Sequence, residues 1–213
     1  MTVEGPATAA ATAGTWVKVC GVRTRGDVVA AAEAGADAFG LVMAPSPRQV
    51  DAEQAATLVR LSTGLDSFLV TVDARPAELL DLARFVGVSG VQPHGRYAAE
   101  AASAGVQAGL LVLRPRPVSG VVELDDIPST QIPLLDTAAG EAHGGTGRRF
   151  DWDLAAAITR RYVLAGGLGP DTVAEAVARL HPWGVDASSG LESAPGVKDA
   201  HLIRRYVQEA KTS

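Results

Sequence analysis

Residues 162–191, YVLAGGLGPDTVAEAVARLHPWGVDASSGL, contain the alternation from which we predict the fold. The stretch begins with a short apolar run, Tyr162 to Ala165, and passes through glycines into an Ala-rich amphipathic segment, Asp171 to Leu180. It ends in a second apolar run, Val185 to Ser188. A strand, a helix and a second strand in this order indicate a βαβ unit with parallel strands that are buried on both faces.

The same alternation extends over the chain from Trp16 onward. The apolar runs are Val17 to Cys20, Ala38 to Met43, Phe68 to Val72, Gly90 to Gln92, Gly109 to Leu113, Ile132 to Asp136, Tyr162 to Ala165 and Val185 to Ser188. The helical segments are Arg25 to Ala34, Ala52 to Ser62, Ala77 to Phe85, Ala98 to Ala104, Trp152 to Thr159, Asp171 to Leu180 and Ala200 to Lys211. Eight strands predict a single compact (β/α)8 TIM barrel. A flavodoxin-like open sheet is the alternative, but it leaves two or three runs unused.

The fifth connection departs from the pattern. The sequence Arg114-Pro115-Arg116-Pro117 follows the fifth run, and Pro128 comes soon after. Because proline disrupts a helix interior, we predict that the fifth helix is degenerate.

Length and composition indicate one domain. The chain has 213 residues, 47% of them hydrophobic and 20% charged, and no long polar linker divides it. We expect residues 16–213 to form the barrel, after a flexible N-terminal extension of small, aperiodic residues at 1–15.

Charge and cysteine content limit the classes of partner. The net charge is −5 and no dense Lys/Arg stripe is present, so neither nucleic acid nor an anionic membrane is expected as a partner. A single cysteine excludes an internal disulfide, and there is neither an apolar stretch of membrane-spanning length nor a signal-peptide pattern. We therefore expect a cytoplasmic protein, monomer or homodimer. The four histidines lack metal-ligand spacing, so no metal site is predicted.

A barrel of this kind carries its active site at the carboxyl ends of the strands. The residues at those ends are Cys20, Met43, Asp73, His94, Arg114, Asp136, Gly166 and Ser189. They include a thiol that can act as a base, a carboxylic acid, and the turns Gly166-Gly167 and Ser189-Gly190. Backbone N–H groups at the last two strands of such barrels often bind phosphate.

Each residue has a simpler explanation when it is taken alone. Cys20 could be a small buried hydrophobe, and Asp136 could cap a turn. Arg48, which follows Pro45 and Pro47, could be a solvated surface residue rather than a ligand for a carboxylate. The combination of these residues at strand ends nevertheless favours a site for a sugar phosphate. The glycine-rich segment 144–147 is predicted to fold over the substrate as a lid.

A set of motifs, in order along the chain, resembles one known family. They are Val17-Lys18-Val19-Cys20-Gly21, Ser46-Pro47-Arg48, Val91-Gln92-Pro93-His94-Gly95, Leu134-Leu135-Asp136, Gly144-Gly145-Thr146-Gly147, Phe150-Asp151-Trp152, Leu164-Ala165-Gly166-Gly167-Leu168, Val185-Asp186-Ala187-Ser188-Ser189-Gly190-Leu191-Glu192 and Pro195-Gly196-Val197-Lys198-Asp199. This pattern, from about Val17 to the final helix, is similar to the phosphoribosylanthranilate isomerase family.

The resemblance implies a cofactor-free Amadori rearrangement in tryptophan biosynthesis. It converts N-(5-phosphoribosyl)anthranilate to 1-(2-carboxyphenylamino)-1-deoxyribulose 5-phosphate, as an intramolecular oxidoreductase of the aldose–ketose type. By motif, Cys20 is the general base, Asp136 the general acid, and Arg48 the partner of the anthranilate carboxylate. Substrate binding is expected at Gly145, Gly166, Gly167, Ser189 and Gly190. Lys18 or backbone dipoles are expected to lower the pKa of the Cys20 thiol.

The chain departs from the family around the aromatic part of the ligand. The third strand reads Val70-Thr71-Val72-Asp73 where an aromatic residue and an asparagine are usual, Pro93 replaces a leucine, and the loop after Met43 is short. Two alternatives therefore stay open: an isomerase acting on a different N-phosphoribosyl amine, and a non-catalytic phosphate-binding barrel.

Overall fold

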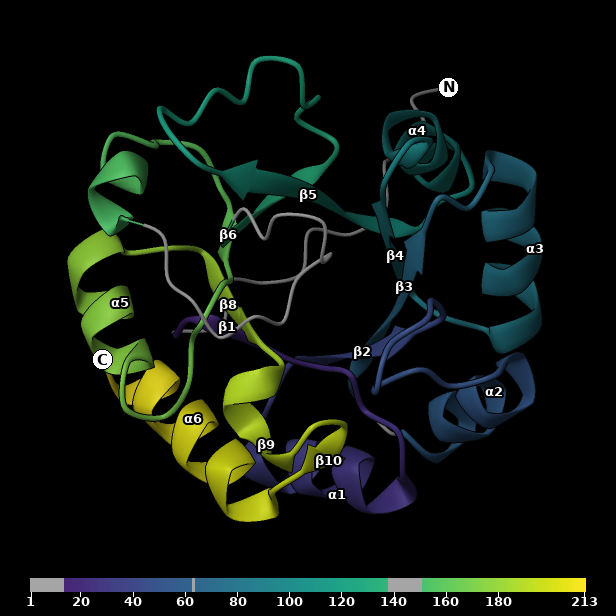
Figure 1. Ribbon diagram of the computed structural model, residues 1–213, viewed down its shortest axis with the longest axis horizontal. Coiled ribbons are helices and arrows are strands. Elements are labelled where there is room, and N and C mark those ends of the chain that lie inside the picture. Colours follow the sequence, from purple (N-terminus) through teal and green to yellow (C-terminus); the bar gives the residue numbers. More distant parts are fainter. Residues whose placement is uncertain (1–13, 63, 138–150) are drawn as a thin grey trace, which may run out of the picture.

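Eight parallel strands form a closed barrel in chain order, with the helices on its outer face (Figure 1). This computed structural model describes residues 14–62, 64–137 and 151–213. The strands are β1 (Trp16–Cys20), β2 (Ala38–Val42), β3 (Asp66–Val72), β4 (Gly90–His94), β5 (Leu111–Val118), β6 (Ile132–Thr137), β7 (Val163–Leu164) and β8 (Gly184–Ala187). The predicted (β/α)8 barrel is confirmed.

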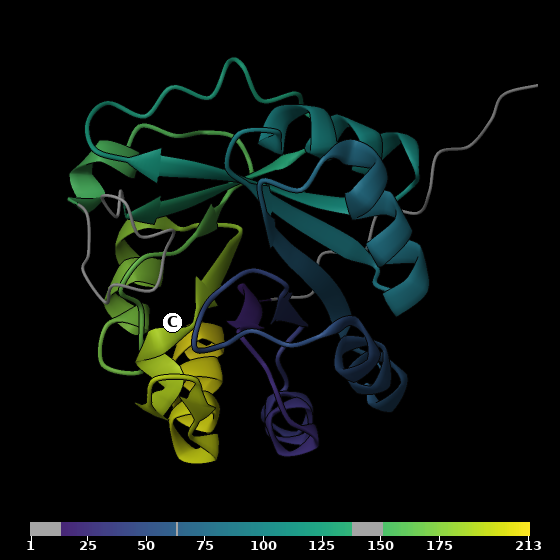
Figure 2. The same cartoon turned by 45° about the vertical axis from the view of Figure 1, so that its right-hand side comes forward.

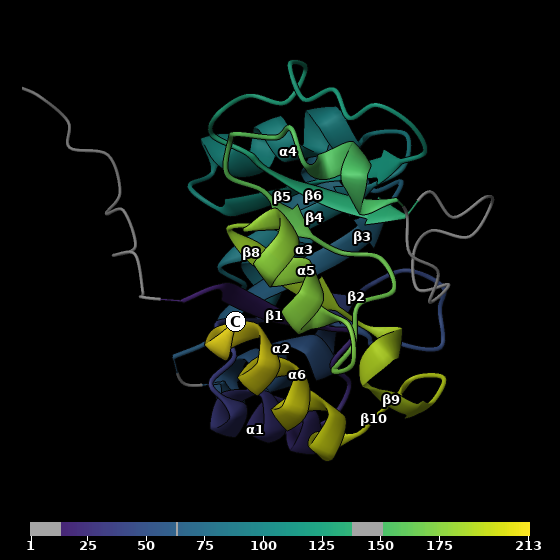
Figure 3. The same ribbon diagram turned by 90° about the vertical axis from the view of Figure 1, so that its left-hand side faces the viewer.

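The helices follow the strands in the expected alternation. They are α1 (Arg25–Ala34), α2 (Ala52–Leu61), α3 (Pro76–Val86), α4 (Ala98–Gln107), α5 (Val173–Leu180) and α6 (Ala200–Thr212). A short hairpin, β9 (Glu192–Ala194) and β10 (Val197–Lys198), precedes α6. Helix α6 lies beside α1, so the last unit of the chain packs against the first (Figures 1 and 3).

Helix α1 shows why some element boundaries are predictable from local sequence. Thr24 and Asp27 form a capping box at its start, and Gly35 ends it in the left-handed region with φ of 81°. Both predicted ends of this helix, Arg25 and Ala34, are correct.

The fifth unit lacks a helix in residues 119–131, and a long loop takes its place (Figure 2). The degenerate helix is therefore confirmed, but the predicted end of the fifth strand at Leu113 is wrong. Strand β5 continues through Pro115 and Pro117 to Val118. It pairs with β4 only through Leu111 and Val112. Beyond Val112 that edge of β5 makes no ladder hydrogen bonds with β4, so proline, which has no N–H, can be accommodated there.

Two helix predictions in the second half of the chain need correction. The helix expected at Trp152 to Thr159 is a short 3₁₀ helix, Trp152–Ala155. Helix α5 begins at Val173 rather than at Asp171. Most of the predicted N-terminal extension and the whole predicted lid segment lie outside the described residues.

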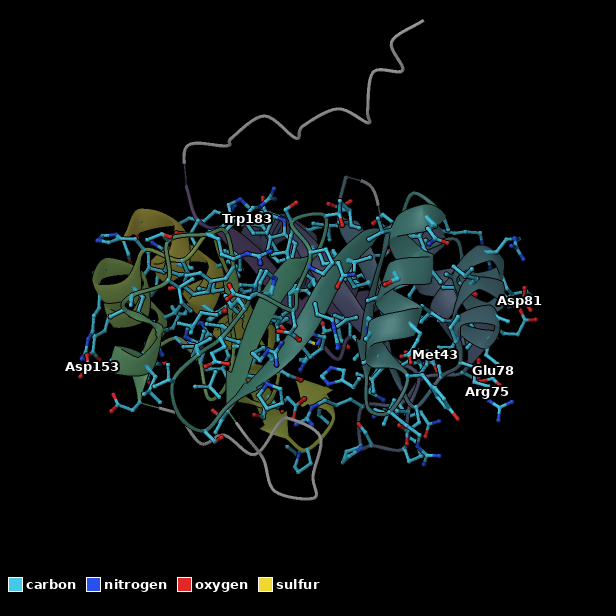
Figure 4. The ribbon with its side chains drawn as sticks, turned by 90° about the horizontal axis from the view of Figure 1, so that it is seen from above. Met43, Arg75, Glu78, Asp81, Asp153 and Trp183 are labelled. Atoms are coloured by element: carbon cyan, nitrogen blue, oxygen red, sulfur yellow. The ribbon has the colours of Figure 1, made fainter. Side chains whose placement is uncertain are left out.

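Aromatic side chains fill the amino-terminal end of the barrel. Trp16 stacks on Trp183 with ring centroids 4.9 Å apart and contacts the edge of Phe68 at 5.9 Å. Figure 4 shows Trp183 at the upper edge of the molecule and Met43, which follows β2, in the lower half. With this end packed, the carboxyl ends of the strands are left to form a cavity. Among the described residues, no helix is long and apolar enough to span a membrane.

Candidate active site

A cavity of about 510 Å³ lies at the carboxyl ends of the strands. The predicted residues that line it are Cys20, Arg48, His94, Asp136, Gly166, Gly167 and Ser189. Other predicted residues within the described ranges lie outside this lining: Met43, Asp73, Arg114 and Gly190. Gly145 lies outside the described residues. The barrel therefore brings the predicted acid, base and arginine to one cavity.

Cys20 ends β1 and is 7% exposed. Its strand neighbour is Gly40 on β2, where an added Cβ would lie 2.9 Å from the Cys20 Sγ. The glycine thus leaves room for the thiol. Burial raises the pKa of Cys20, and the nearby Lys18 ammonium lowers it by less, so the pKa stays above its ordinary value. Lys18 acts in the expected direction, but desolvation is the larger effect.

Asp136 lies near the end of β6, where its Oδ1 accepts a 2.7 Å hydrogen bond from the backbone N–H of Thr137. Burial, with a smaller contribution from the Asp186 carboxylate, raises the pKa of Asp136 to about 6. Roughly one molecule in ten then carries the proton at pH 7. Asp136 is therefore suited to donate a proton near neutral pH.

A buried lysine, Lys18, connects three residues that line the cavity. The Lys18 Nζ donates 3.0 Å hydrogen bonds to Asp186 Oδ1 on β8 and to Gln92 Oε1 on β4. The Gln92 Nε2 lies 3.1 Å from His94 Nε2. Sequence reasoning gave no role to Asp186 or Gln92. The sequence does contain one signal for this network. Lys18 and Cys20 are two positions apart on β1, so their side chains lie on the same face of the strand, and a lysine beside the thiol can be expected from that spacing.

Arg48 is held by a glutamate that sequence reasoning also missed. Its Nε and Nη2 donate to Glu192 Oε1 and Oε2 at 2.7 and 2.9 Å. Lys198 Nζ donates to the same Oε1 at 2.9 Å and to the Ser188 carbonyl at 2.8 Å. Burial raises the pKa of Glu192, but these hydrogen bonds outweigh it and hold the pKa below its ordinary value. Glu192 is therefore the anion that holds the Arg48 guanidinium in place.

The two glycine turns pack against neighbouring backbone. Gly166 and Gly167 both have positive φ, 87° and 65°. An added Cβ on Gly166 would meet the Thr137 backbone and side chain, and one on Gly190 would meet the Leu168 carbonyl oxygen. The turns after β7 and β8 thus touch each other through backbone atoms without side chains between them, an arrangement typical of turns whose backbone N–H groups bind phosphate.

Metal ligation has no support in residues 14–62, 64–137 and 151–213. No three His, Cys, Asp or Glu side chains in this part of the chain lie close enough together to hold a metal ion. The groups that line the cavity instead offer proton transfer and anion binding.

Comparisons with known proteins agree with this geometry. The family model for N-(5'phosphoribosyl)anthranilate (PRA) isomerase matches residues 17–209. A relative of that name from Pelobacter propionicus is 41% identical over 201 residues, which cover 92% of this chain and 95% of the relative.

Solved structures show the same likeness in three dimensions. Phosphoribosyl anthranilate isomerase from Thermotoga maritima has a TM-score of 0.82 and 34% identity, covering 93% of this chain and all of that one. A structure of the enzyme in complex with reduced 1-(o-carboxyphenylamino)-1-deoxyribulose 5-phosphate has a TM-score of 0.76 and 31% identity, with the same coverage. This chain therefore belongs to the N-(5'-phosphoribosyl)anthranilate isomerase family.

Proposed function

We propose that this chain converts N-(5-phosphoribosyl)anthranilate to 1-(2-carboxyphenylamino)-1-deoxyribulose 5-phosphate in tryptophan biosynthesis, with Asp136 as general acid and Cys20 as general base. The observation that carries the proposal is that these two side chains line one cavity together with Gly166 and Gly167 after β7 and Ser189 after β8. Family membership supports the reaction, and the chemistry of the cavity supports the residue roles.

The first step opens the furanose ring. Asp136 gives its proton to the ring oxygen while the bond from C1 to that oxygen breaks, and the nitrogen lone pair forms a C=N bond. The products are a protonated Schiff base and the Asp136 carboxylate. A pKa of about 6 keeps part of the enzyme in the required protonated form at neutral pH.

The second step removes the proton from C2. The Cys20 thiolate accepts it, and the electron pair of the C–H bond moves toward the iminium nitrogen to form an enaminol. The buried thiol has a raised pKa in the free protein, but the positive charge of the iminium favours the thiolate when substrate is bound. Loss of the O–H proton and gain of a proton at C1 then give the ketone.

Binding of the two anionic ends of the substrate is assigned to separate parts of the cavity. The phosphate is placed at Gly166, Gly167, Ser189 and Gly190, where small residues let backbone N–H groups approach it. The anthranilate carboxylate is placed on Arg48. A guanidinium has five N–H donors and Glu192 takes two of them, so the Nη1 group is left for a ligand.

The aromatic ring is assigned to an apolar wall. This wall contains Val42, Pro45, Pro47, Val70 and Val72, which all line the cavity. Because Val70 and Val72 belong to the strand that departs from the family pattern, a different N-phosphoribosyl aryl amine is the second candidate substrate.

The test is a fluorescence assay of freshly generated phosphoribosylanthranilate with the wild-type protein. Cys20→Ser and Asp136→Asn are each expected to lower kcat ~100-fold or more, as loss of a general base or acid does. Asp81→Asn changes an exposed carboxylate on α3 and should leave kcat unchanged. Near-normal turnover in either active-site variant would remove that residue from its role.

Failure of the folded wild-type protein to consume this substrate would overturn the substrate assignment. Turnover of N-phosphoribosylaniline under the same conditions would then support the second candidate. Binding without turnover of either amine would favour a non-catalytic phosphate-binding barrel.

A further inference from the structure

Lys18 lies beneath the cavity and has no exposed surface. The lysine is not part of the cavity lining, but its ammonium group is bonded to Gln92 and Asp186 and lies near Cys20, and all three of these residues belong to that lining. These residues come from β1, β4 and β8. One buried cation is therefore in contact with three separate strands of the active-site wall.

Two hydrogen bonds hold the ammonium group in place. Lys18 Nζ donates to Asp186 Oδ1 and to Gln92 Oε1, both at 3.0 Å. The Asp186 carboxylate pairs with the buried positive charge, which offsets part of the cost of burying it. The Cys20 side chain lies on the same face of β1 as Lys18, because the two residues are two positions apart.

This arrangement also fixes the orientation of Gln92. Only the amide oxygen can face an ammonium group, so the Gln92 NH₂ group must point the other way. It lies 3.1 Å from His94 Nε2. The amide therefore donates and the ring nitrogen accepts, which places the proton of the neutral imidazole on Nδ1.

We propose that Lys18 is a positioning residue, which keeps its positive charge beside the Cys20 base and, through Gln92, holds His94 in its neutral form with Nε2 unprotonated. The inference rests on the proposed function, because it gives Cys20 the role of base. The position of Gly40 supports it: an added Cβ there would lie 2.9 Å from Cys20 Sγ and 3.2 Å from Lys18 Nζ. The thiol and the ammonium thus share one space.

Charged groups around Cys20 come from several elements. Lys18 on β1 makes the largest charge contribution and lowers the pKa of the thiol, Asp186 on β8 raises it, and Lys198 on β10 lowers it. The other titratable groups of the same cavity are Arg48, His94 and Asp136. Since Lys18 is the leading positive charge, its removal should move the thiol titration to higher pH.

The first experiment follows thiolate formation by ultraviolet absorbance in the full chain. Cys20 is its sole cysteine, so the difference from a Cys20→Ser sample reports this thiol alone. In Lys18→Met the midpoint should rise by about one pH unit or more, the usual effect of removing an adjacent opposite charge. Lys211→Met, which loses a lysine paired with Asp37, should match the wild type. An unchanged midpoint in Lys18→Met would overturn the proposal.

A double variant, Lys18→Met with Asp186→Asn, removes both charges of the buried pair and replaces the single variant if that does not fold. The same upward shift is expected, reduced by the loss of the Asp186 charge, and no shift contradicts the proposal.

The second experiment needs no variant of Lys18. Nitrogen-15 NMR of the imidazoles, with His94 assigned by the signals missing from His94→Asn, should show Nε2 unprotonated and the proton on Nδ1. A proton on Nε2 at neutral pH would overturn the proposal. Neither experiment measures turnover, so a chain that fails to isomerise phosphoribosylanthranilate but passes both would refute the proposed substrate and leave the positioning of these groups intact.

Discussion

Arg48 and Glu192 form a two-point ion pair, with Nε to Oε1 at 2.7 Å and Nη2 to Oε2 at 2.9 Å. The pair is nearly buried, with side chains 14% and 4% exposed. It joins the loop after β2 to the hairpin after β8, and Gly196 packs beside Pro47 at the same junction. A guanidinium held along one edge has few orientations left, so its remaining N–H groups are preorganised for a ligand.

Glu192→Gln should weaken binding of a substrate that carries a carboxylate. A neutral amide cannot replace the two charge-assisted bonds, so Arg48 loses its fixed orientation. We expect KM for phosphoribosylanthranilate to rise ~10-fold, which corresponds to about 1.4 kcal/mol. For N-phosphoribosylaniline, which has no carboxylate, KM should change little.

The control for this substitution is Glu33→Gln, on the exposed face of α1. It should leave KM for both amines at the wild-type value. An equal rise in KM for both amines in Glu192→Gln would show that Glu192 supports the cavity in general and not the carboxylate site.

Asp136→Asn should stabilise the fold at neutral pH. The carboxyl has a pKa of about 6 in the folded chain and an ordinary value of 3.8, so the folded state binds its proton more tightly. Tighter binding of this proton stabilises the folded state fully below about pH 4, and the stabilisation is lost as the pH rises through 6. A shift of about two units corresponds to about 3 kcal/mol at pH 7. The asparagine has no charge to desolvate, so its thermal unfolding should show this gain at pH 7 and almost none at pH 4.

The outcome that would contradict this is a variant no more stable than the wild type at pH 7. Asp81→Asn serves as the control because it makes the same change at an exposed position, where no buried charge is removed. Combined with the expected loss of turnover, a positive result would show that the acid is held in place at a cost in stability.

The sequence predicted those parts of the fold that depend on local signals. The capping box of α1 and the glycine after it set both ends of that helix. The positions of Cys20 and Asp136 at strand ends followed from the alternation of apolar runs, since the barrel then brings all the carboxyl ends to one side. The end of β5 is not predictable in this way, because its prolines are compatible with a strand only where one edge has no partner, and local sequence does not show that edge.

The polar network of the site could not be predicted because its partners are far apart in the chain. Lys18 and Asp186 are separated by 168 positions, and Arg48 and Glu192 by 144. Each partner alone looks like an ordinary charged residue, and only barrel closure between β1 and β8 brings them together. The balance of burial and charge that raises the pKa of Cys20 likewise depends on three-dimensional surroundings.

Gly40→Ala should impair the base without disrupting the barrel. The new methyl group would lie 2.9 Å from Cys20 Sγ and 3.2 Å from Lys18 Nζ, so one of them must move. Overpacking of this kind costs about 1–3 kcal/mol of stability. We expect kcat to fall ~10-fold or more, since displaced catalytic groups lose their alignment. Gly26→Ala, where the methyl group would have its nearest contact at 3.6 Å, should keep full kcat.

Gly190→Ala should separate the two turns assigned to phosphate. Its Cβ would press on the Leu168 carbonyl oxygen and lie 3.1 Å from the Gly169 Cα, and backbone cannot rotate away as a side chain can. The turns after β7 and β8 would have to move apart. Backbone N–H groups of the two turns could then no longer bind the same phosphate together. Inorganic phosphate, tested as a competitive inhibitor, should bind at least ~10-fold more weakly to this variant than to the wild type or to Gly26→Ala. Unchanged inhibition in a folded Gly190→Ala protein would mean that phosphate is bound elsewhere, because no arrangement of these two turns accommodates the methyl group without displacing the backbone.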